Sequence, residues 1–583
     1  MLHPRVEPSE TSHSRQCAEA SSAFRLVVQP LRVWKRLQVS YYGGKYSIER
    51  VLALDTYTRS TSVSRVLLVC IWTPMPMITL VVVQELIPLQ DPSEGWRVNY
   101  GFWIRAVILA FVVGHTITGQ ARFLIDGVVI SPGRLALLSA CAAAMFTGGA
   151  AAISAYVVFP VPFFVLTLAP MFYVLLILAV RFIVGLDEMM AHSDQLIRYI
   201  IFVCAQVTVA IVYPLYESLF RVAQGTRYQM IVILLLPVIK VALKNMLLRC
   251  TANMEDMIPE TVIFTVDFFN TIYIATCMQS ASSAGAVAAI TITDLLQTGV
   301  MLYGLHRRTA AIQAKLHEVA SIPTGAHCVL TMLSSLCRDS GKFETQARRG
   351  IRIYSCLPHC ISEADKAHLA CLDKLLEDDN QVATPGKSAA GPGAKRTERC
   401  AYGDSTCKLR MLCTRKHRGS ILPVLPDSAS DRLSASTKRQ NAPTKRSPIL
   451  LETLGALFTT ECIVVAAYLE AIVPLFYCNY ILLMVHLPSA HYHTEMAGVT
   501  HENVGSTVRP VLLFGLLQMV SFALLLLVIK RNLGLRILYQ IGFVLETQMS
   551  LIQGKLMLWM IITFSFRVVH FGMDFTYKFS WIG

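Results

Sequence analysis

The sequence predicts an all-α, polytopic helical membrane protein with about 10–11 transmembrane helices and a cytosolic insert. Three observations support this fold class. The mean hydropathy is +0.51 and only 15% of the residues are charged, whereas soluble domains run near 25% charged. Apolar runs of about 20 residues, the length that crosses a bilayer, recur along the chain. Lys and Arg collect at alternate ends of these runs, as cytosolic loops require.

A basic insert, residues 306–449, sets the orientation of the chain. It holds 24 Lys and Arg against 13 Asp and Glu, a surplus of 11 within a net charge of +14. An excess of Lys and Arg beside spans marks the cytosolic side. Apolar and charged residues alternate at helical spacing over 306–379, which predicts a small helical cytosolic subdomain. Residues 380–449, rich in Ser, Pro, Gly, Lys and Arg, predict a disordered basic linker.

The N-terminal segment, residues 1–65, is polar and basic and is expected to be cytosolic. Within it, Ser21–Leu37 places apolar residues at helical spacing with basic residues between them. This pattern fits contact with anionic lipids of the inner leaflet or a partly disordered tail. No signal-peptide apolar region precedes Val66, so the first span is expected to serve as its own insertion signal.

The apolar runs form two membrane blocks, 66–305 with about eight helices and 450–583 with about three. The run at 228–248 is the least regular, because Lys240 and Lys244 interrupt it. The predicted spans are 66–87, 99–118, 134–158, 161–184, 196–219, 228–248, 259–281, 284–304, 455–486, 509–529 and 551–573. The stretch 487–508 contains no Lys or Arg and is expected to lie outside.

Four polar residues are predicted to meet inside the bilayer, in a hairpin of two spans with its apex near Ser282–Ser283. Asp267 and Gln297 lie about fifteen residues from the apex, and Asn270 and Asp294 about twelve. At about 1.5 Å per residue, both pairs lie roughly 17–23 Å deep, at or just past the midplane. Asp267 and Asn270, three residues apart, share one helix face.

Lys240 reaches a similar depth in the preceding span, and Glu470 in the ninth span is a further candidate member of this polar cluster. Ionisable residues inside a bilayer are costly and suggest function by default. Two interpretations stay open: a transport site, or a structural cluster that fixes helix packing. We expect Lys240 or a bound cation to neutralise Asp267 and Asp294, because two carboxylates in a low dielectric disfavour double ionisation.

Polar residues near span ends have simpler interpretations. Arg105 is expected to snorkel to the interface, and Glu461 to be interfacial. His486, His491 and His493 follow the ninth span. Imidazole suits zinc or copper, but their spacing is not a standard motif, so a solvated loop is the better interpretation.

The sequence carries no motif of a known enzyme class. P-loop, kinase, Rossmann, zincin and nucleophile-elbow patterns are absent, and Cys356 and Cys360 lack a paired C-x2-C signature. We therefore expect a protein that is not an enzyme and has no metal or cofactor. Positive charge lies beside the spans, which favours membrane topology over nucleic-acid binding.

Four stretches carry a resemblance to a known group: Tyr46–Asp55, Ile87–Trp96, Leu457–Cys462 and Phe543–Gln548. They resemble uncharacterised multi-spanning membrane proteins of oomycetes, over most of both membrane blocks. The resemblance implies a membrane fold and no substrate, and no functional residue carries over from it.

The leading functional hypothesis is a transporter or channel for an ion or small solute, in a plasma membrane or endomembrane. The alternative is a membrane-embedded scaffold or receptor that acts through its cytosolic insert. A polar cavity that reaches Asp267 and Asp294 would favour transport. A dry, ion-paired cluster with an ordered insert would favour the scaffold.

Overall fold

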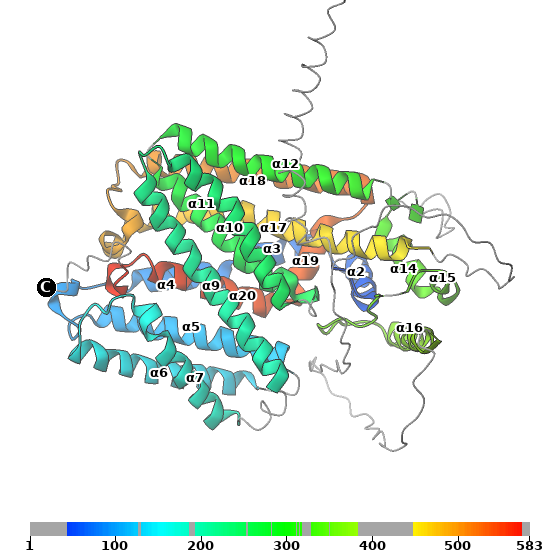
Figure 1. Ribbon diagram of the computed structural model, residues 1–583, viewed down its shortest axis with the longest axis horizontal. Helices are drawn as coiled ribbons and strands as arrows, with labels where there is room; N and C mark the ends of the chain where they lie inside the picture. Colours follow the sequence, from blue (N-terminus) through cyan, green and yellow to red (C-terminus); the bar gives the residue numbers. More distant parts are fainter. Residues whose placement is uncertain are drawn as a thin grey trace, which may run out of the picture.

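The protein is all-α in its computed structural model (Figure 1). The structure describes residues 44–125, 130–185, 193–251, 255–281, 283–310, 312–313, 315–316, 328–348, 350–382 and 447–573. Within these ranges, ten helices are long and apolar enough to cross a membrane, and β-structure is limited to isolated bridges. The predicted fold class is confirmed. The predicted surface segment Ser21–Leu37 and residues 383–446 of the predicted linker lie outside the described residues.

The first membrane block follows the apolar runs closely. Its first span is two helices, α3 and α4, separated at Thr73 and Pro74, and its seventh is a π-helix, η4, that continues into α11. Its helices are α3 (Val63–Trp72), α4 (Met75–Leu86), α5 (Tyr100–Leu124), α6 (Pro132–Tyr156), α7 (Phe164–Ile183), α9 (Ser193–Ala223), α10 (Gln229–Cys250), η4 (Pro259–Asp267), α11 (Phe268–Ser280) and α12 (Ala284–Thr309). The irregular run at 228–248 is therefore a continuous helix, α10.

The second block consists of α17 (Ile449–Met484), α18 (Val504–Leu533), α19 (Ile537–Thr547) and α20 (Met549–Ser565). The predicted eleventh span, 551–573, is the shorter α20, with 17 residues, followed by the turn η7 (Val569–Phe571). A full crossing needs about 20 residues. The short helix after α18 is α19, most of whose residues are buried.

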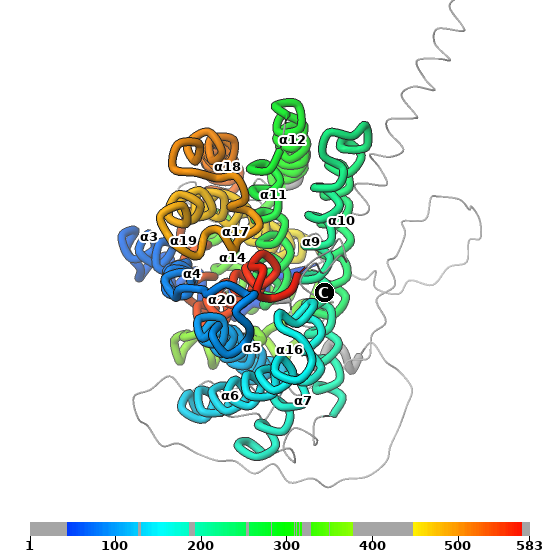
Figure 2. Tube along the Cα trace, turned by 90° about the vertical axis from the view of Figure 1, so that its left-hand side faces the viewer, coloured from blue at the N-terminus to red at the C-terminus, as the bar shows by residue number. Residues whose placement is uncertain are grey.

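Two helices form the centre of the bundle. The most apolar window of α17 is 89% buried, and that of the continuous η4–α11 is 100% buried, whereas the same window of α12 is 17% buried. Figure 2, which looks along the bundle, shows α17, α11 and α20 surrounded by the other helices. A helix that is apolar all round and enclosed has almost no lipid face, so buried polar residues on α17 and η4–α11 contact protein.

The two ends of the bundle differ. At one end, α2 (Ile48–Ser60) packs with α14 (Val329–Arg338) and α16 (Glu363–Val382) of the insert, and α15 (Ser340–Glu344) packs on α14 (Figure 1, right). At the other end, the backbone N–H of Thr494 donates to the carbonyl of Arg567, 2.9 Å away. We call these the insert end and the loop end. The insert and the loop 487–508, which has no Lys or Arg, lie at opposite ends of the bundle, as the charge pattern predicts. Which of the two ends faces the cytosol stays a prediction.

Candidate functional site

A cluster of buried charges lies between α10, η4 and α17, and we call it the central cluster. The ammonium of Lys240 lies 2.7 Å from Glu470 Oε1 and 3.3 Å from Asp267 Oδ1. Lys244, one turn further along α10, reaches the same Asp267 oxygen at 2.7 Å. Asp267 is fully buried and both lysines are nearly so. In a medium of low dielectric, such pairs hold the helices in one register.

The π-helix η4 positions the acid at the middle of this cluster. Its residues Pro259–Asp267 close wider turns than an α-helix, and Asp267 is the last of them. Residues seven apart fall on nearly one face of an α-helix, yet Glu260 and Asp267 contact different partner helices. Wider turns rotate the two acids apart. Such π segments are rare and occur frequently at functional sites.

Asp294 on α12 is the third carboxylate of the central cluster. It accepts a hydrogen bond from the amide of Gln518 on α18, and no described Lys or Arg comes within ion-pair distance of it. With Asn270 and Gln297 it lines a cavity of about 20 Å³ between α9, α10, α11 and α12. A cavity of that size admits about one water molecule.

The six predicted residues therefore come together in two adjoining parts. Lys240, Asp267 and Glu470 form ion pairs, and Asn270, Asp294 and Gln297 line the cavity. Lys240 pairs with Asp267, as expected, and also with Glu470 from α17, and no described Lys or Arg lies within ion-pair distance of Asp294. Gln518, which bonds Asp294, lies 224 positions from it in the chain, and no local pattern marks it.

The charges of the central cluster do not balance. Three carboxylates, Asp267, Glu470 and Asp294, face two ammonium groups, Lys240 and Lys244. With every group ionised, the cluster carries one surplus negative charge. An uncompensated buried charge costs several kcal/mol, so one proton or one monovalent cation neutralises the cluster at lowest cost. Asp294 is the member that no described Lys or Arg approaches within ion-pair distance.

A second cluster, at the loop end, is built on arginine. Arg105 Nη1 lies 2.9 Å from Glu85 Oε2, and His493 Nε2 lies 3.0 Å from the same oxygen. Glu495 then links His493, at 3.6 Å, to Arg567, at 3.7 Å. All five side chains are at least nine-tenths buried. We call this the loop-end cluster.

The loop-end cluster corrects two expectations. Arg105 does not snorkel, and His493 does not lie in a solvated loop, because Glu85 and Glu495 hold both in the interior. Burial alone would lower the pKa of His493, but the two carboxylates outweigh it and raise the pKa to about 9. Against the opposing effect of burial, Arg567 and His493 lower the pKa of Glu495 to about 2.

A third cluster lies at the insert end. Arg50 Nη2 lies 2.8 Å from Glu461 Oε1, and the hydroxyl of Tyr46 also donates to Glu461. Glu461, expected at the interface, is fully buried because α2 covers it. Asp256 accepts from Arg352 at 3.2 Å and from Ser355 Oγ at 3.0 Å, which ties the insert to the bundle. Burial would raise the pKa of Asp256, but Arg352 and Arg50 hold it below the usual value.

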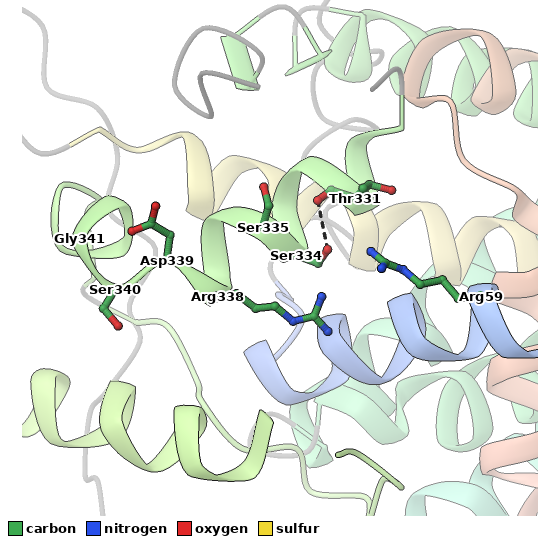
Figure 3. Close-up of a pocket in the computed structure, with 8 residues that line it drawn as sticks. All are labelled: Arg59, Thr331, Ser334, Ser335, Arg338, Asp339, Ser340 and Gly341. Carbon is green, nitrogen blue, oxygen red and sulfur yellow. Dashed lines mark hydrogen bonds between the residues drawn. The ribbon is translucent and has the colours of Figure 1, made fainter. Parts of the chain in front are cut away.

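A surface cleft of about 630 Å³ opens beside this third cluster. Figure 3 shows Arg59 of α2 and Arg338 of α14 pointing toward one another across it. Asp55 pairs with both guanidinium groups, Asp365 pairs with Arg338, and Asp339 lines the same cleft. The cleft therefore has no net positive charge with which to bind an anion. Nowhere in the described ranges do three His, Cys, Asp or Glu side chains form a group that could hold a metal.

Comparison with known proteins gives no match: no protein family, no curated protein and no solved structure is similar to this chain.

Proposed function

We propose that this integral multi-pass membrane protein is a cation-coupled transporter, in which Asp294 binds a proton or a monovalent cation. One observation carries the proposal: Asp294 is a buried carboxylate on a cavity inside the bundle, and no described Lys or Arg lies within ion-pair distance of it. Intramembrane carboxylates that face a polar cavity are typical of ion and proton pathways. The charge of one proton restores neutrality to the central cluster.

The chemistry of the neighbouring groups supports exchange at this site. Asn270 and Gln297 place amide groups on the cavity, and Gln518 donates to Asp294. Amide and carboxylate oxygens are ligands for hard cations. The small cavity fits an occluded state, in which neither end of the bundle opens to the site. Alternating access would then open one end at a time.

The test compares Asp294→Asn with the wild type in proteoliposomes under an imposed membrane potential. A trapped pH dye reports proton entry, and radioactive sodium reports the monovalent cation. We expect Asp294→Asn to lower the coupled flux about tenfold or more. Its unfolding temperature should stay close to that of the wild type, because the amide oxygen still accepts from Gln518 and no ion pair is lost.

Asp194→Asn is the matched control, since Asp194 is an exposed carboxylate at the start of α9. It should leave flux and stability unchanged. Two results would overturn the proposal: wild-type liposomes no more permeable than empty ones to either cation, or Asp294→Asn that transports like the wild type.

A second candidate function, a receptor or scaffold, is favoured by the docked insert. Backbone N–H groups of Ile48 and Glu49 donate to the carbonyls of Arg352 and Ile353, at 3.0 and 2.9 Å. A receptor must couple the bundle to this segment. This candidate therefore predicts no flux in the wild type, and a change in hydrogen exchange over residues 350–357 when Asp294 is replaced by Asn.

A further inference from the structure

Four helices enclose another buried pair of charges, distinct from the central cluster. Lys555 on α20 lies with its ammonium 3.8 Å from Glu260 Oε1 on η4, and both side chains are fully buried. Gln120 of α5 donates to Glu260 Oε1 at 2.6 Å, and Lys555 donates to Gln206 of α9 at 2.5 Å. A separation of 3.8 Å is too long for a direct hydrogen bond. The two charges therefore face each other without touching.

Several polar atoms of this group have no hydrogen-bond partner among the described residues. They are the second carboxylate oxygen of Glu260, the side-chain oxygen of Gln120 and the side-chain nitrogen of Gln206. Lys555 has three N–H donors, of which one donates to Gln206. Buried polar atoms are nearly always satisfied, and those that are not indicate bound water, an ion or a chemical role.

The unsatisfied atoms match one small molecule. Two are acceptors, on Glu260 and Gln120, and the donors are on Gln206 and Lys555. A water molecule can donate to both acceptors and accept from one N–H each of Gln206 and Lys555, and buried waters make about three such bonds. The geometry points to a second proton-binding site, in which Glu260 takes up a proton through bound water while Lys555 holds the water and pairs with the carboxylate in its ionised form.

The chemistry of the step is a simple transfer. A hydrated proton gives up one O–H bond as an O–H bond forms at the free oxygen of Glu260. Lys555 keeps its three N–H bonds and its charge throughout. The rings of Trp559 and Phe202, 4.9 and 5.6 Å from the ammonium, stabilise the charge of Lys555 and offset part of the cost of burying it. The charged and neutral forms of Glu260 thus differ by one proton and by no other bond.

The surroundings isolate this pair from the other charges. Lys555 of α20 is the cation that faces Glu260. The helix α9 adds one further titratable side chain near Glu260, Tyr199. The helices α10 and α17 and the turn η3 (Glu255–Met257) also pack against η4. Their charged groups are directed elsewhere: Lys244 at Asp267, Glu461 at Arg50, and Asp256 at Arg352. Glu260 therefore titrates against Lys555 alone among the charged groups within ion-pair distance.

The position of the site suggests its role. Glu260 lies seven residues nearer the insert end than Asp267, on the same π-helix. This inference rests on the proposed function: the Glu260 site would pass protons between the insert end of the bundle and the central cluster. The Glu260 site is distinct from the central cluster, because the partners of Glu260 belong to α5, α9 and α20 rather than to α10, α12 and α18.

Infrared difference spectroscopy on the full chain tests the site without any need for transport. A buried carboxyl group that takes up a proton gains a C=O stretching band of the neutral acid. We expect bands of this kind to respond to pH in the wild type, with one component that is lost in Glu260→Gln and persists in Asp294→Asn. Proton flux should fall about tenfold or more in Glu260→Gln.

The control is Glu363→Gln, because Glu363 is a glutamate on the exposed surface of α16, and it should leave band and flux intact. If Glu260→Gln does not fold, the double variant with Lys555→Met removes both charges and should fold, since buried pairs tolerate replacement of both partners. Identical titrating bands in the wild type and the folded variant would overturn the second site. A band lost with Glu260 but no flux in the wild type would instead refute the proposed function and leave the proton site standing.

Discussion

The buried ion pairs at the two ends of the bundle and those inside it use different cations. At the ends, arginine is the partner: Arg50 with Glu461, and Arg105 with Glu85. Inside, lysine is the partner: Lys240 with Glu470, and Lys555 with Glu260. Guanidinium stays protonated and binds carboxylates through a rigid fork, whereas ammonium is a compact charge whose protonation responds to burial.

This difference separates fixed contacts from adjustable ones. An arginine pair joins loops and helices in a single geometry, which suits the ends, where α2 and the loop 485–503 must be held against the bundle. A lysine pair leaves room for water and for exchange of partners. The ends are therefore expected to determine stability, and the interior clusters to determine transport.

The largest expected effect is at the insert end. Arg50→Met leaves Glu461 buried without its cation and should lower the free energy of unfolding by about 3–5 kcal/mol. Chemical denaturation in detergent measures the change. The double variant Arg50→Met, Glu461→Leu should recover most of the loss, and two losses that simply add would show that the pair does not interact.

The next effect is a pH dependence at the loop end. The pKa of His493 is raised from 6.5 to about 9. Its stabilising contribution is therefore fully present below about pH 6.5 and is lost as the pH rises through about 9, by about 3 kcal/mol. Unfolding temperatures at about pH 6 and about pH 10 should differ in the wild type and less so in His493→Gln. An equal drop in both would assign the effect to another group.

A smaller effect is expected when lysine and arginine are exchanged as partners of the buried carboxylates. Lys240→Arg keeps the positive charge but contacts Glu470 through a larger, forked group. Flux should therefore fall about tenfold, and the free energy of unfolding should change by about 1–3 kcal/mol. Arg567→Lys at the loop end is the reciprocal change, and it should affect stability with little effect on flux. The opposite pattern would break the division between ends and interior.

The smallest effect is expected at the surface. Lys366 and Glu363 form an ion pair of 2.6 Å on α16, with side chains 52% and 87% exposed. Replacement of either by Ala should change the free energy of unfolding by no more than about 0.5 kcal/mol. A larger loss would mean that the insert end is held by its surface and not by Arg50 and Asp256.

Much of the fold and part of the site follow from local patterns. The length and composition of the apolar runs predict ten of the helices. Counting residues from the hairpin apex brings Asp267, Asn270, Asp294 and Gln297 to one depth, because helical rise is constant. By contrast, the fully buried Arg105 and His493 were expected near the surface. Their burial depends on Glu85 and Glu495, and nothing near them in the sequence reveals which acid they meet.

The sequence by itself determined the membrane class, and it predicts the depth of the polar residues and the side of the membrane on which the basic insert lies. Hydropathy, helical rise and charge are sums over neighbouring residues, so they can be read locally. Tertiary structure alone decided the partners: Glu470 for Lys240, 230 positions away, and Glu461 for Arg50, 411 positions away. A buried charge is stable only beside its partner, and only the packing of distant helices determines which groups become neighbours.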